Sequence, residues 1–241
     1  MKRLLTSTIL AVLVATFVIG SIRAQTPKAP NPAFKMIEFH MALLKRGPKW
    51  TGNATPDTTG LESAQREYAT SLMQSGKAVI VGRLTDDGEI RGVYVFRAKT
   101  PEEARQWAED SPGVKAGHLI AEMHPWWSED LMKTPTLPIK MTTAYLGFLT
   151  RGAKWTPEKT PATEALQKAH LANINRLAEM KKLVVAGPFG DNGTLRGIFV
   201  FRVASLEEAK ELAASDPSVQ AGRLAISMHP WLVPEGILPS P

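Results

Sequence analysis

Several short stretches of the chain alternate apolar and polar residues with a period of two, the pattern of half-buried β-strands. In the first of them, the apolar positions are Ile37, Phe39, Met41 and Leu43. Two longer stretches, residues 58–75 and 163–180, carry apolar residues at the spacing of an α-helix. On the second helix, the apolar face consists of Leu166, Ile174 and Leu177. The chain is therefore expected to mix strands with helices.

The same series of elements occurs twice. A strand and a long helix are followed by two strands whose connecting dipeptides, Asp-Gly at 87–88 and Asn-Gly at 192–193, are typical of β-hairpins. A shorter helix comes next, with Thr100 or Ser205 as the expected N-cap. A last strand, LIAEMHPWW or LAISMHPWL, completes the series. The order βαββαβ predicts an α+β, ferredoxin-like unit with both helices on one face of an antiparallel sheet.

The two series are copies of one unit. The segment LLKRGPKW reappears as FLTRGAKW, and DDGEIRGVYVFR reappears as DNGTLRGIFVFR. The second copy follows the first by about 105 residues, without a gap from the pair His40/Tyr145 to the pair Trp127/Leu232. The expected divisions are a first repeat over 35–127, a proline-containing linker over 128–140, a second repeat over 141–233 and a tail over 234–241.

The tetrapeptide MHPW closes both repeats, at residues 123–126 and 228–231. In the last strand of the second repeat, one face carries Leu224, Ile226 and Met228. The opposite face, which the helices leave uncovered, carries Ala225, Ser227, His229 and Trp231. Because tryptophan side chains are seldom left in water, we expect the two sheets to close face to face as an intramolecular pseudo-dimer.

The first 24 residues have the layout of a secretory signal peptide, with Lys2 and Arg3 at the tip, an apolar run over 9–22 and the small residue Ala24. We expect cleavage after Ala24 and a short leader over residues 25–34. The alternative is an uncleaved anchor, because the apolar run approaches the roughly 20 residues that cross a bilayer. The signal favours an exported protein, periplasmic or secreted, without a membrane contact after cleavage.

Composition narrows the classes of function. The 241 residues are 44% hydrophobic and include no cysteine, so the protein can form proper cores but neither disulfides nor thiolate metal sites. The formal net charge is +6, yet the predicted signal peptide contains three basic residues and no acidic one. Removing them leaves 6 − 3 = +3, an ordinary surface balance. Without a long basic run, nucleic acid is not an expected partner.

Three segments of the second repeat, KAHLANINRLAEMKKLVVAGPF, ASDPSVQAGRL and the closing HPW, carry a family resemblance. In them the repeat resembles YCII-related (YciI-like) proteins of the dimeric α+β barrel superfamily, over residues 141–232; the first repeat resembles the family weakly. The resemblance implies that the two repeats form one intramolecular dimeric α+β barrel. It also implies a small-molecule pocket with His170 and Asp216 as the proposed catalytic pair. Relatives in the superfamily include isomerases, lyases and monooxygenases that use no bound metal or cofactor, and none is expected here.

The first repeat departs from this pattern, since Gln65 stands in place of His170 and Ser111 in place of Asp216. We therefore expect at most one site of the family type. From the residues alone, His170 could also be a core histidine satisfied by one hydrogen bond. Asp216 before Pro217 could be only an N-cap, a role that Ser111 is expected to fill equally well in the first repeat. A carboxylate can in addition fix the tautomer of a histidine.

Further candidates for contacting a ligand are Tyr145, Arg151, Trp155, Ser227 and His229. The motif RGxKW allows Arg151 either to pack over Trp155 in a cation–π contact or to bind an anion at the pocket mouth. Because the first repeat keeps the motif, the structural interpretation is favoured. A metal site formed by His124, His229 and Glu122 is a further alternative, although no spacing within either strand supports it.

Taken together, the residues and the resemblance predict an exported small-molecule enzyme in which His170, oriented by Asp216, transfers a proton in an isomerisation or elimination. The alternative is a non-catalytic module that binds a small molecule in the same pocket. The sequence leaves open the substrate and whether two such molecules pair as a homodimer.

Overall fold

The computed structural model describes residues 35–239, so the predicted signal peptide and leader, residues 1–34, lie outside the described part of the chain. The first repeat contains β1 (Met36–Arg46), α1 (Pro56–Gln74), β2 (Ala78–Leu84), β3 (Ile90–Phe96), α2 (Pro101–Glu109), α3 (Pro112–Lys115) and β4 (Leu119–Glu129). The second contains β5 (Met141–Arg151), α4 (Pro161–Glu179), β6 (Leu183–Pro188), β7 (Leu195–Phe201), α5 (Leu206–Ala214), α6 (Pro217–Gln220) and β8 (Leu224–Pro234). The predicted βαββαβ order is confirmed, with one additional short helix before each last strand.

The long helices begin two residues earlier than the apolar pattern predicts. Thr58 and Thr163, the predicted first residues of the helices, are the third residues of α1 and α4. Each bonds back to a threonine N-cap, Thr55 or Thr160, in a reciprocal capping box. The predicted N-caps of the shorter helices, Thr100 and Ser205, are confirmed, because their side chains accept hydrogen bonds from backbone N–H groups of the first turn.

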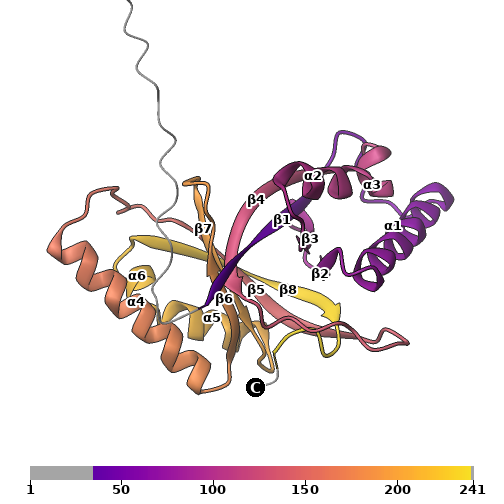
Figure 1. Ribbon diagram of the computed structural model, residues 1–241. Coiled ribbons are helices and arrows are strands. Elements are labelled where there is room, and N and C mark those ends of the chain that lie inside the picture. Colours follow the sequence, from indigo (N-terminus) through magenta and orange to yellow (C-terminus); the bar gives the residue numbers. More distant parts are fainter. Residues whose placement is uncertain (1–34, 240–241) are drawn as a thin grey trace, which may run out of the picture.

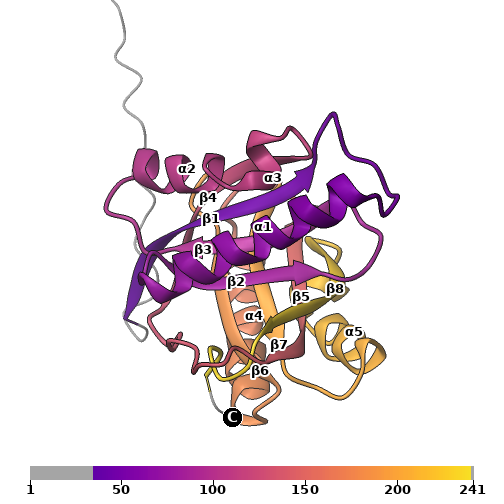
Figure 2. The same ribbon diagram turned by 90° about the vertical axis from the view of Figure 1, so that its right-hand side faces the viewer.

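The eight strands form one antiparallel sheet in the order β4-β1-β3-β2-β8-β5-β7-β6. Strands β2 and β8 join the repeats, with Arg83 opposite Leu232 and Leu84 opposite Trp231. The outer strands β4 and β6 approach each other, and one isolated bridge joins Trp126 of β4 to Phe189, the residue after β6. The sheet therefore curls into a nearly closed barrel, with α1–α3 outside one half and α4–α6 outside the other (Figures 1 and 2). The predicted intramolecular dimeric α+β barrel is confirmed.

Within residues 35–239, three hydrophobic cores hold this architecture together. The largest fills the barrel and combines residues of both repeats, including Phe39, Met41, Leu146, Val200 and the fully buried Trp126 and Trp231. A second core lies between the helices and strands of the first repeat, and a third lies in the same place in the second repeat, where Leu224, Ile226 and Met228 pack. The faces predicted for the last strand are therefore the observed ones. Ile237 and Leu238, beyond β8, are also buried in the barrel core.

The two MHPW segments make equivalent contacts across the pseudo-twofold axis. His124 Nδ1 lies 2.5 Å from Asp191 Oδ2 in the hairpin of the second repeat, and His229 Nδ1 lies 2.5 Å from Asp86 Oδ2 in the hairpin of the first. The tryptophans are equally reciprocal, since Trp126 packs against Gly187 and Trp231 against Gly82. Each MHPW therefore fastens its own strand to the other repeat, which gives the motif a structural role.

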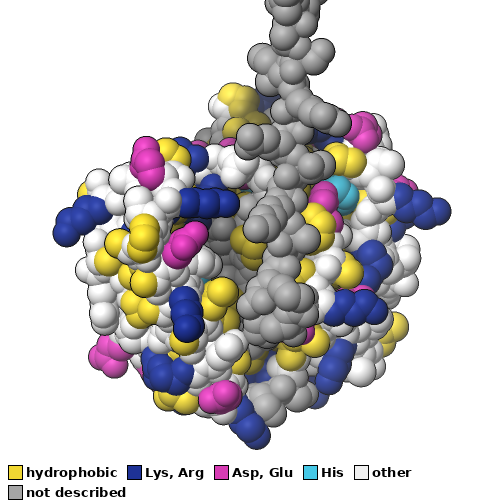
Figure 3. Space-filling view, turned by 60° about the vertical axis from the view of Figure 1, so that its left-hand side comes forward, with side chains coloured by type: hydrophobic (Ala, Val, Ile, Leu, Met, Phe, Trp, Pro, Cys, Tyr) yellow, Lys and Arg dark blue, Asp and Glu magenta, His cyan; other side chains and the backbone are white. Residues whose placement is uncertain are grey.

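Charges on the surface are mixed. On the face drawn in Figure 3, Lys and Arg side chains are interspersed with Asp, Glu and uncharged side chains rather than gathered in one basic stripe. Among the helices within residues 35–239, none is both long and apolar enough to span a bilayer.

Candidate active site

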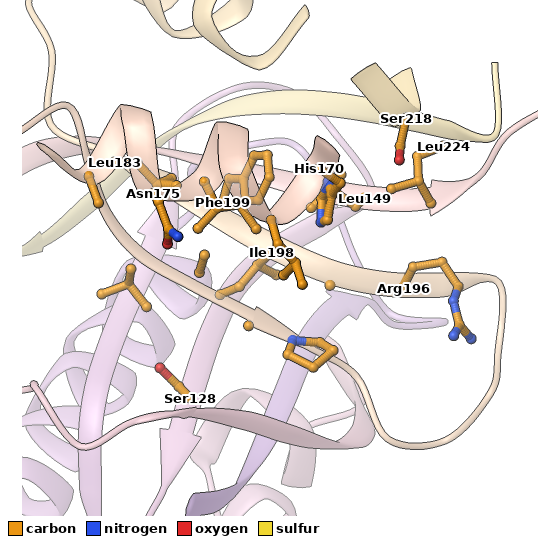
Figure 4. Close-up of a pocket in the computed structure, with 18 of the residues that line it drawn as sticks. Ser128, Leu149, His170, Asn175, Leu183, Arg196, Ile198, Phe199, Ser218 and Leu224 are labelled. Carbon is orange, nitrogen blue, oxygen red and sulfur yellow. The ribbon is translucent and has the colours of Figure 1, made fainter. Parts of the chain in front are cut away.

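A cavity of about 450 Å³ lies beside α4, β6 and β7 of the second repeat, and Met36, Ser128, Glu129 and Leu131 of β1, β4 and the segment after β4 also line it. Much of its wall is apolar and includes Leu149, Leu171, Ile174, Leu183, Val185, Ile198, Phe199 and Leu224. A few polar side chains also line it, among them Gln167, His170, Asn175, Arg196 and Arg223. Figure 4 shows His170 beneath the helix and Arg196 toward the end of the cavity where Leu224 lies. A pocket of this size with few polar groups is typical of a small-molecule site.

His170 and Asp216 meet at this cavity. The Nδ1 atom of His170 lies 2.7 Å from Oδ2 of Asp216, and the imidazole stacks on Phe199 with ring centroids 5.9 Å apart. The side chain of Asp216 is fully buried, whereas 13% of the His170 side chain stays exposed. Within the described residues, no hydrogen bond is made by Nε2 of His170. When the Asp216 carboxylate accepts a hydrogen bond from the Nδ1–H group, the lone pair of the neutral imidazole lies on Nε2.

Asp216 combines the predicted N-cap with the contact to His170. Its Oδ1 accepts hydrogen bonds from the backbone N–H groups of Ser218, at 2.8 Å, and Val219, at 3.4 Å, while Oδ2 faces the imidazole. The expectation that Ser111 caps α3 equally well is wrong. Ser111 makes no side-chain cap bond, and its buried Oγ has no partner among the described residues. Capping uses only Oδ1 of Asp216, so it does not account for the contact between Oδ2 and the imidazole of His170.

Two further residues that the sequence pattern did not single out support the carboxylate. Asn173 Nδ2 lies 3.4 Å from Oδ2 of Asp216, and Arg176 Nη2 donates to Oδ1 of Asn173 at 2.7 Å. Asn173 is itself buried. It lies one helical turn beyond His170 and Arg176 lies a turn beyond that, so a search of the His170 face of the helix for polar residues could have found both.

Of the other residues predicted to contact a ligand, only Trp155 lines this cavity. Trp155 lines the cavity, and Arg151 lies over its indole with 5.5 Å between Cζ and the ring centroid. Tyr145 packs in the core between the sheet and α4 and α5. Ser227 and His229 lie on β8, on the face opposite the helices, where Ser227 Oγ is 3.1 Å from His229 Nε2. Tyr145, Arg151, Ser227 and His229 are not among the residues that line this cavity.

The first repeat keeps a cavity at the equivalent place, with a volume of about 520 Å³, but different chemistry. Gln65, in the position of His170, donates through Nε2 to Tyr94 Oη at 2.6 Å and accepts from the backbone N–H of Gly113 at 2.8 Å. Burial raises the pKa of Tyr94 to about 12, against the lowering effect of the Gln65 hydrogen bond. Neither Gln65 nor this neutral phenol offers a base near neutral pH.

The metal alternative has no geometric support in residues 35–239, where no group of three or more His, Asp or Glu side chains converges. His124 directs its two ring nitrogens at different carboxylates, Glu122 at 2.8 Å and Asp191 at 2.5 Å. Glu122 is also bonded to Lys45, and this hydrogen bond lowers the pKa of Glu122. These charges are paired with one another rather than arranged around one point.

Comparison with known proteins bears on the family and the fold. The model of the YCII-related domain matches residues 38–126 and 150–228. The uncharacterized protein YjpA of Bacillus subtilis (strain 168) is 34% identical over 76 residues, which cover 30% of this chain and 87% of YjpA, so that protein corresponds to a single repeat. A mutant chlorite dismutase from Candidatus Nitrospira defluvii, in complex with cyanide, has a TM-score of 0.52 at 14% identity, over 80% of this chain and 90% of that one. Such low identity shows a common fold alone.

Proposed function

Since this chain belongs to the YCII-related domain family, we propose that it is a small-molecule enzyme in which His170 transfers a proton, oriented by Asp216. The observation that carries the proposal is the 2.7 Å contact between His170 Nδ1 and Asp216 Oδ2 at the wall of a cavity of about 450 Å³. A histidine that served only in packing would need no buried carboxylate beside it. At the equivalent position of the first repeat, Gln65 packs without one.

The proposed mechanism follows from the two ring nitrogens of His170. Asp216 accepts the Nδ1–H bond and so keeps the lone pair on Nε2, the nitrogen without a partner among the described residues. Nε2 would remove a proton from a substrate carbon next to an electron-withdrawing group. The imidazolium so formed is stabilised by the Asp216 carboxylate. It then returns the proton to another atom, in an isomerisation, or to a leaving group, in an elimination.

A non-catalytic binding module is the second candidate function, and one observation favours it. The first repeat retains a cavity of about 520 Å³ although it has neither member of the His-Asp pair. A cavity that persists without the pair supports a role for the fold in binding alone. Binding of a small molecule without its conversion would support this candidate over an enzyme.

We also propose that the protein is exported, on the basis of residues 1–24. The expected mature protein begins at Gln25. Mass spectrometry of protein recovered from the expressing cells and their medium tests this proposal; a chain that retains Met1 or residues 1–24 in all fractions would contradict it.

The catalytic proposal is tested with His170→Gln, which copies the residue of the first repeat. We expect proton transfer to fall at least about 100-fold, the usual lower bound for a general base, with the free energy of unfolding little changed. Proton transfer can be measured without a known product, by incubating the protein in D₂O with a panel of small organic acids and cyclic compounds and detecting deuterium uptake by mass spectrometry.

The matched control is Gln65→Ala in the first repeat, where the equivalent side chain faces the other cavity. It should leave deuterium uptake unchanged. Uptake that persists at the wild-type rate in His170→Gln would refute the assignment of His170.

A further inference from the structure

Three arginines surround Trp155 at the candidate active site. The Cζ atoms of Arg151, Arg196 and Arg223 lie 5.5, 4.8 and 4.4 Å from the centre of the indole ring. Trp155, Arg196 and Arg223 line the same cavity as His170, whereas Arg151 does not line it. We call these three arginines and Trp155 the arginine cluster. Three like charges around one ring repel one another, and a single cation–π contact contributes only about 0.5–1 kcal/mol when exposed.

The partners of the arginine cluster are neutral. Arg151 donates to the backbone carbonyl of Asn192 at 2.6 Å, and Arg223 donates to Thr156 Oγ1 at 3.3 Å. Arg196 makes no side-chain hydrogen bond to any residue in the described range. Asp191 lies close enough to Arg196 to act on its charge, but Oδ2 of Asp191 is already bonded to His124.

The electrostatic state of Arg196 reflects this environment. Burial lowers the pKa of Arg196, and the neighbouring positive charges of Arg151 and Arg223 lower it further, against the raising effect of the Asp191 carboxylate. A positive charge that is partly buried and lacks an ion pair costs free energy. An anion at the cavity wall would offset that cost for Arg196 and Arg223 at the same time.

The first repeat provides an internal comparison. Its equivalent tryptophan, Trp50, also lies beneath two arginines, Arg46 and Arg91. There, however, Arg46 forms an ion pair with Asp87, and Arg91 donates to backbone carbonyl groups of the hairpin. The residue equivalent to Arg223 is His118, whose ring centroid lies 4.4 Å from that of Trp50.

The second repeat differs from the first at two of these positions. Asn192 replaces Asp87, which removes a carboxylate, and Arg223 replaces His118, which adds a guanidinium. A cation–π contact that only stabilises the loop explains what the repeats share, the tryptophan with two arginines over it. It does not explain why a carboxylate is lost and a third guanidinium is gained around Trp155, which lines the same cavity as His170.

We propose that Arg196 and Arg223 bind the oxyanion, a carboxylate or phosphate group, of a small organic anion whose apolar body occupies the cavity beside His170. This inference rests on the proposed function, because it names the class of substrate for the same cavity. Guanidinium groups suit such a ligand, since each can donate two parallel hydrogen bonds to a carboxylate or phosphate. The apolar wall formed by Ile174, Ile198 and Phe199 suits the remainder of the molecule.

The test uses the mature protein and three probes: benzoate, inorganic phosphate and the neutral analogue benzyl alcohol. Binding is followed by calorimetry and by the NMR signal of the Trp155 indole N–H, identified by its loss in Trp155→Phe. We expect benzoate to bind and shift the Trp155 signal, and benzyl alcohol to bind more weakly by about tenfold or more. Stronger binding of phosphate than of benzoate would identify a phosphate ester as the preferred class, and the reverse a carboxylate.

Four variants locate the binding. Arg196→Gln and Arg223→His should each weaken binding of the anionic probes by about tenfold, as expected for loss of a hydrogen bond to a charged group. Asn192→Asp, which restores the carboxylate of the first repeat beside Arg151, should also weaken it. Arg91→Gln, the equivalent change in the first repeat, is the matched control and should have no effect.

Equal losses in Arg91→Gln and Arg196→Gln, or no loss in Arg196→Gln, would overturn the proposal. Failure of this inference can be distinguished from failure of the proposed function, because His170→Gln should abolish proton transfer yet keep anion binding within about threefold of the wild type. Loss of proton transfer in His170→Gln together with unchanged anion binding in Arg196→Gln would remove the arginine cluster from the site and leave His170 in place.

Discussion

At the scale of single residues, the difference between the repeats depends on two side chains that face each other. The carboxylate of Asp216 contacts the imidazole of His170 through Oδ2 and accepts hydrogen bonds from the N–H groups of α6 through Oδ1. In the first repeat, Gln65 bonds Tyr94 and Gly113 instead, and the shorter Ser111 reaches no partner among the described residues. Both positions stay polar in both copies, but only the second repeat pairs an imidazole with a carboxylate.

Tyr94 gives a prediction at this scale. Because burial raises its pKa to about 12 from an ordinary value of 10.0, the folded protein keeps the phenolic proton between pH 10 and 12 while the unfolded chain loses it. The free energy of unfolding should therefore fall as pH rises through this window, by up to about 3 kcal/mol for this residue.

Tyr94→Phe, which copies Phe199 of the second repeat, removes this titration. Urea unfolding of both proteins at several pH values should show that the stability difference between wild type and Tyr94→Phe is constant below pH 9 and moves in favour of the variant from about pH 10 to 12. A difference that stays the same up to pH 12 would show that the Tyr94 phenol ionises equally easily in the folded and unfolded states.

At the scale of elements, the structure follows local rules that can be found in the sequence. The hairpin dipeptides lie between β2 and β3 and between β6 and β7, and threonine or serine caps begin α1, α2, α4 and α5. The short helices α3 and α6 are the exception. Both begin with proline, but only Asp216 caps its helix through the side chain. The two short helices therefore differ in their N-terminal residue. Asp216 both caps α6 and contacts His170, whereas Ser111 does neither in the first repeat.

At the scale of the whole molecule, the barrel requires close approach of backbone between the repeats. Gly187 in β6 lies against Trp126 and the backbone of Trp127 in β4, and Gly82 in β2 lies against Trp231 in β8. A Cβ atom at Gly187 would stand 2.0 Å from the carbonyl oxygen of Trp127. Glycine is needed at both positions because the MHPW strand of the other repeat packs directly against it. This contact forms between the repeats, so the sequence of one repeat does not predict it.

We expect Gly187→Ala to lower the free energy of unfolding by about 1–3 kcal/mol or more, because backbone would have to move to accept the methyl group. The measurement is urea unfolding followed by tryptophan fluorescence. The contrasting variant is Gly60→Ala in α1, where nothing lies within 4 Å of an added Cβ. It should raise stability by up to about 1 kcal/mol, since alanine is the better helix former and stands at the equivalent position, Ala165. Gly187→Ala as stable as the wild type would mean that the barrel opens at β4 and β6 without cost.

The sequence by itself determined the duplication, the βαββαβ order, the buried face of the last strands and the two members of the His-Asp pair. The first three follow from periodicity, turn residues and the comparison of two copies, which are local or repeated along the chain. The His-Asp pair is what the resemblance to the YCII-related family implies. Tertiary structure alone decided that Ser111 fails as a cap, and that Tyr145, Ser227 and His229 lie away from the cavity. It also decided that Arg196 and Arg223 meet at Trp155. The physical reason is that such contacts depend on side-chain length and on distances between residues far apart in the chain, for which neither period nor spacing carries a signal.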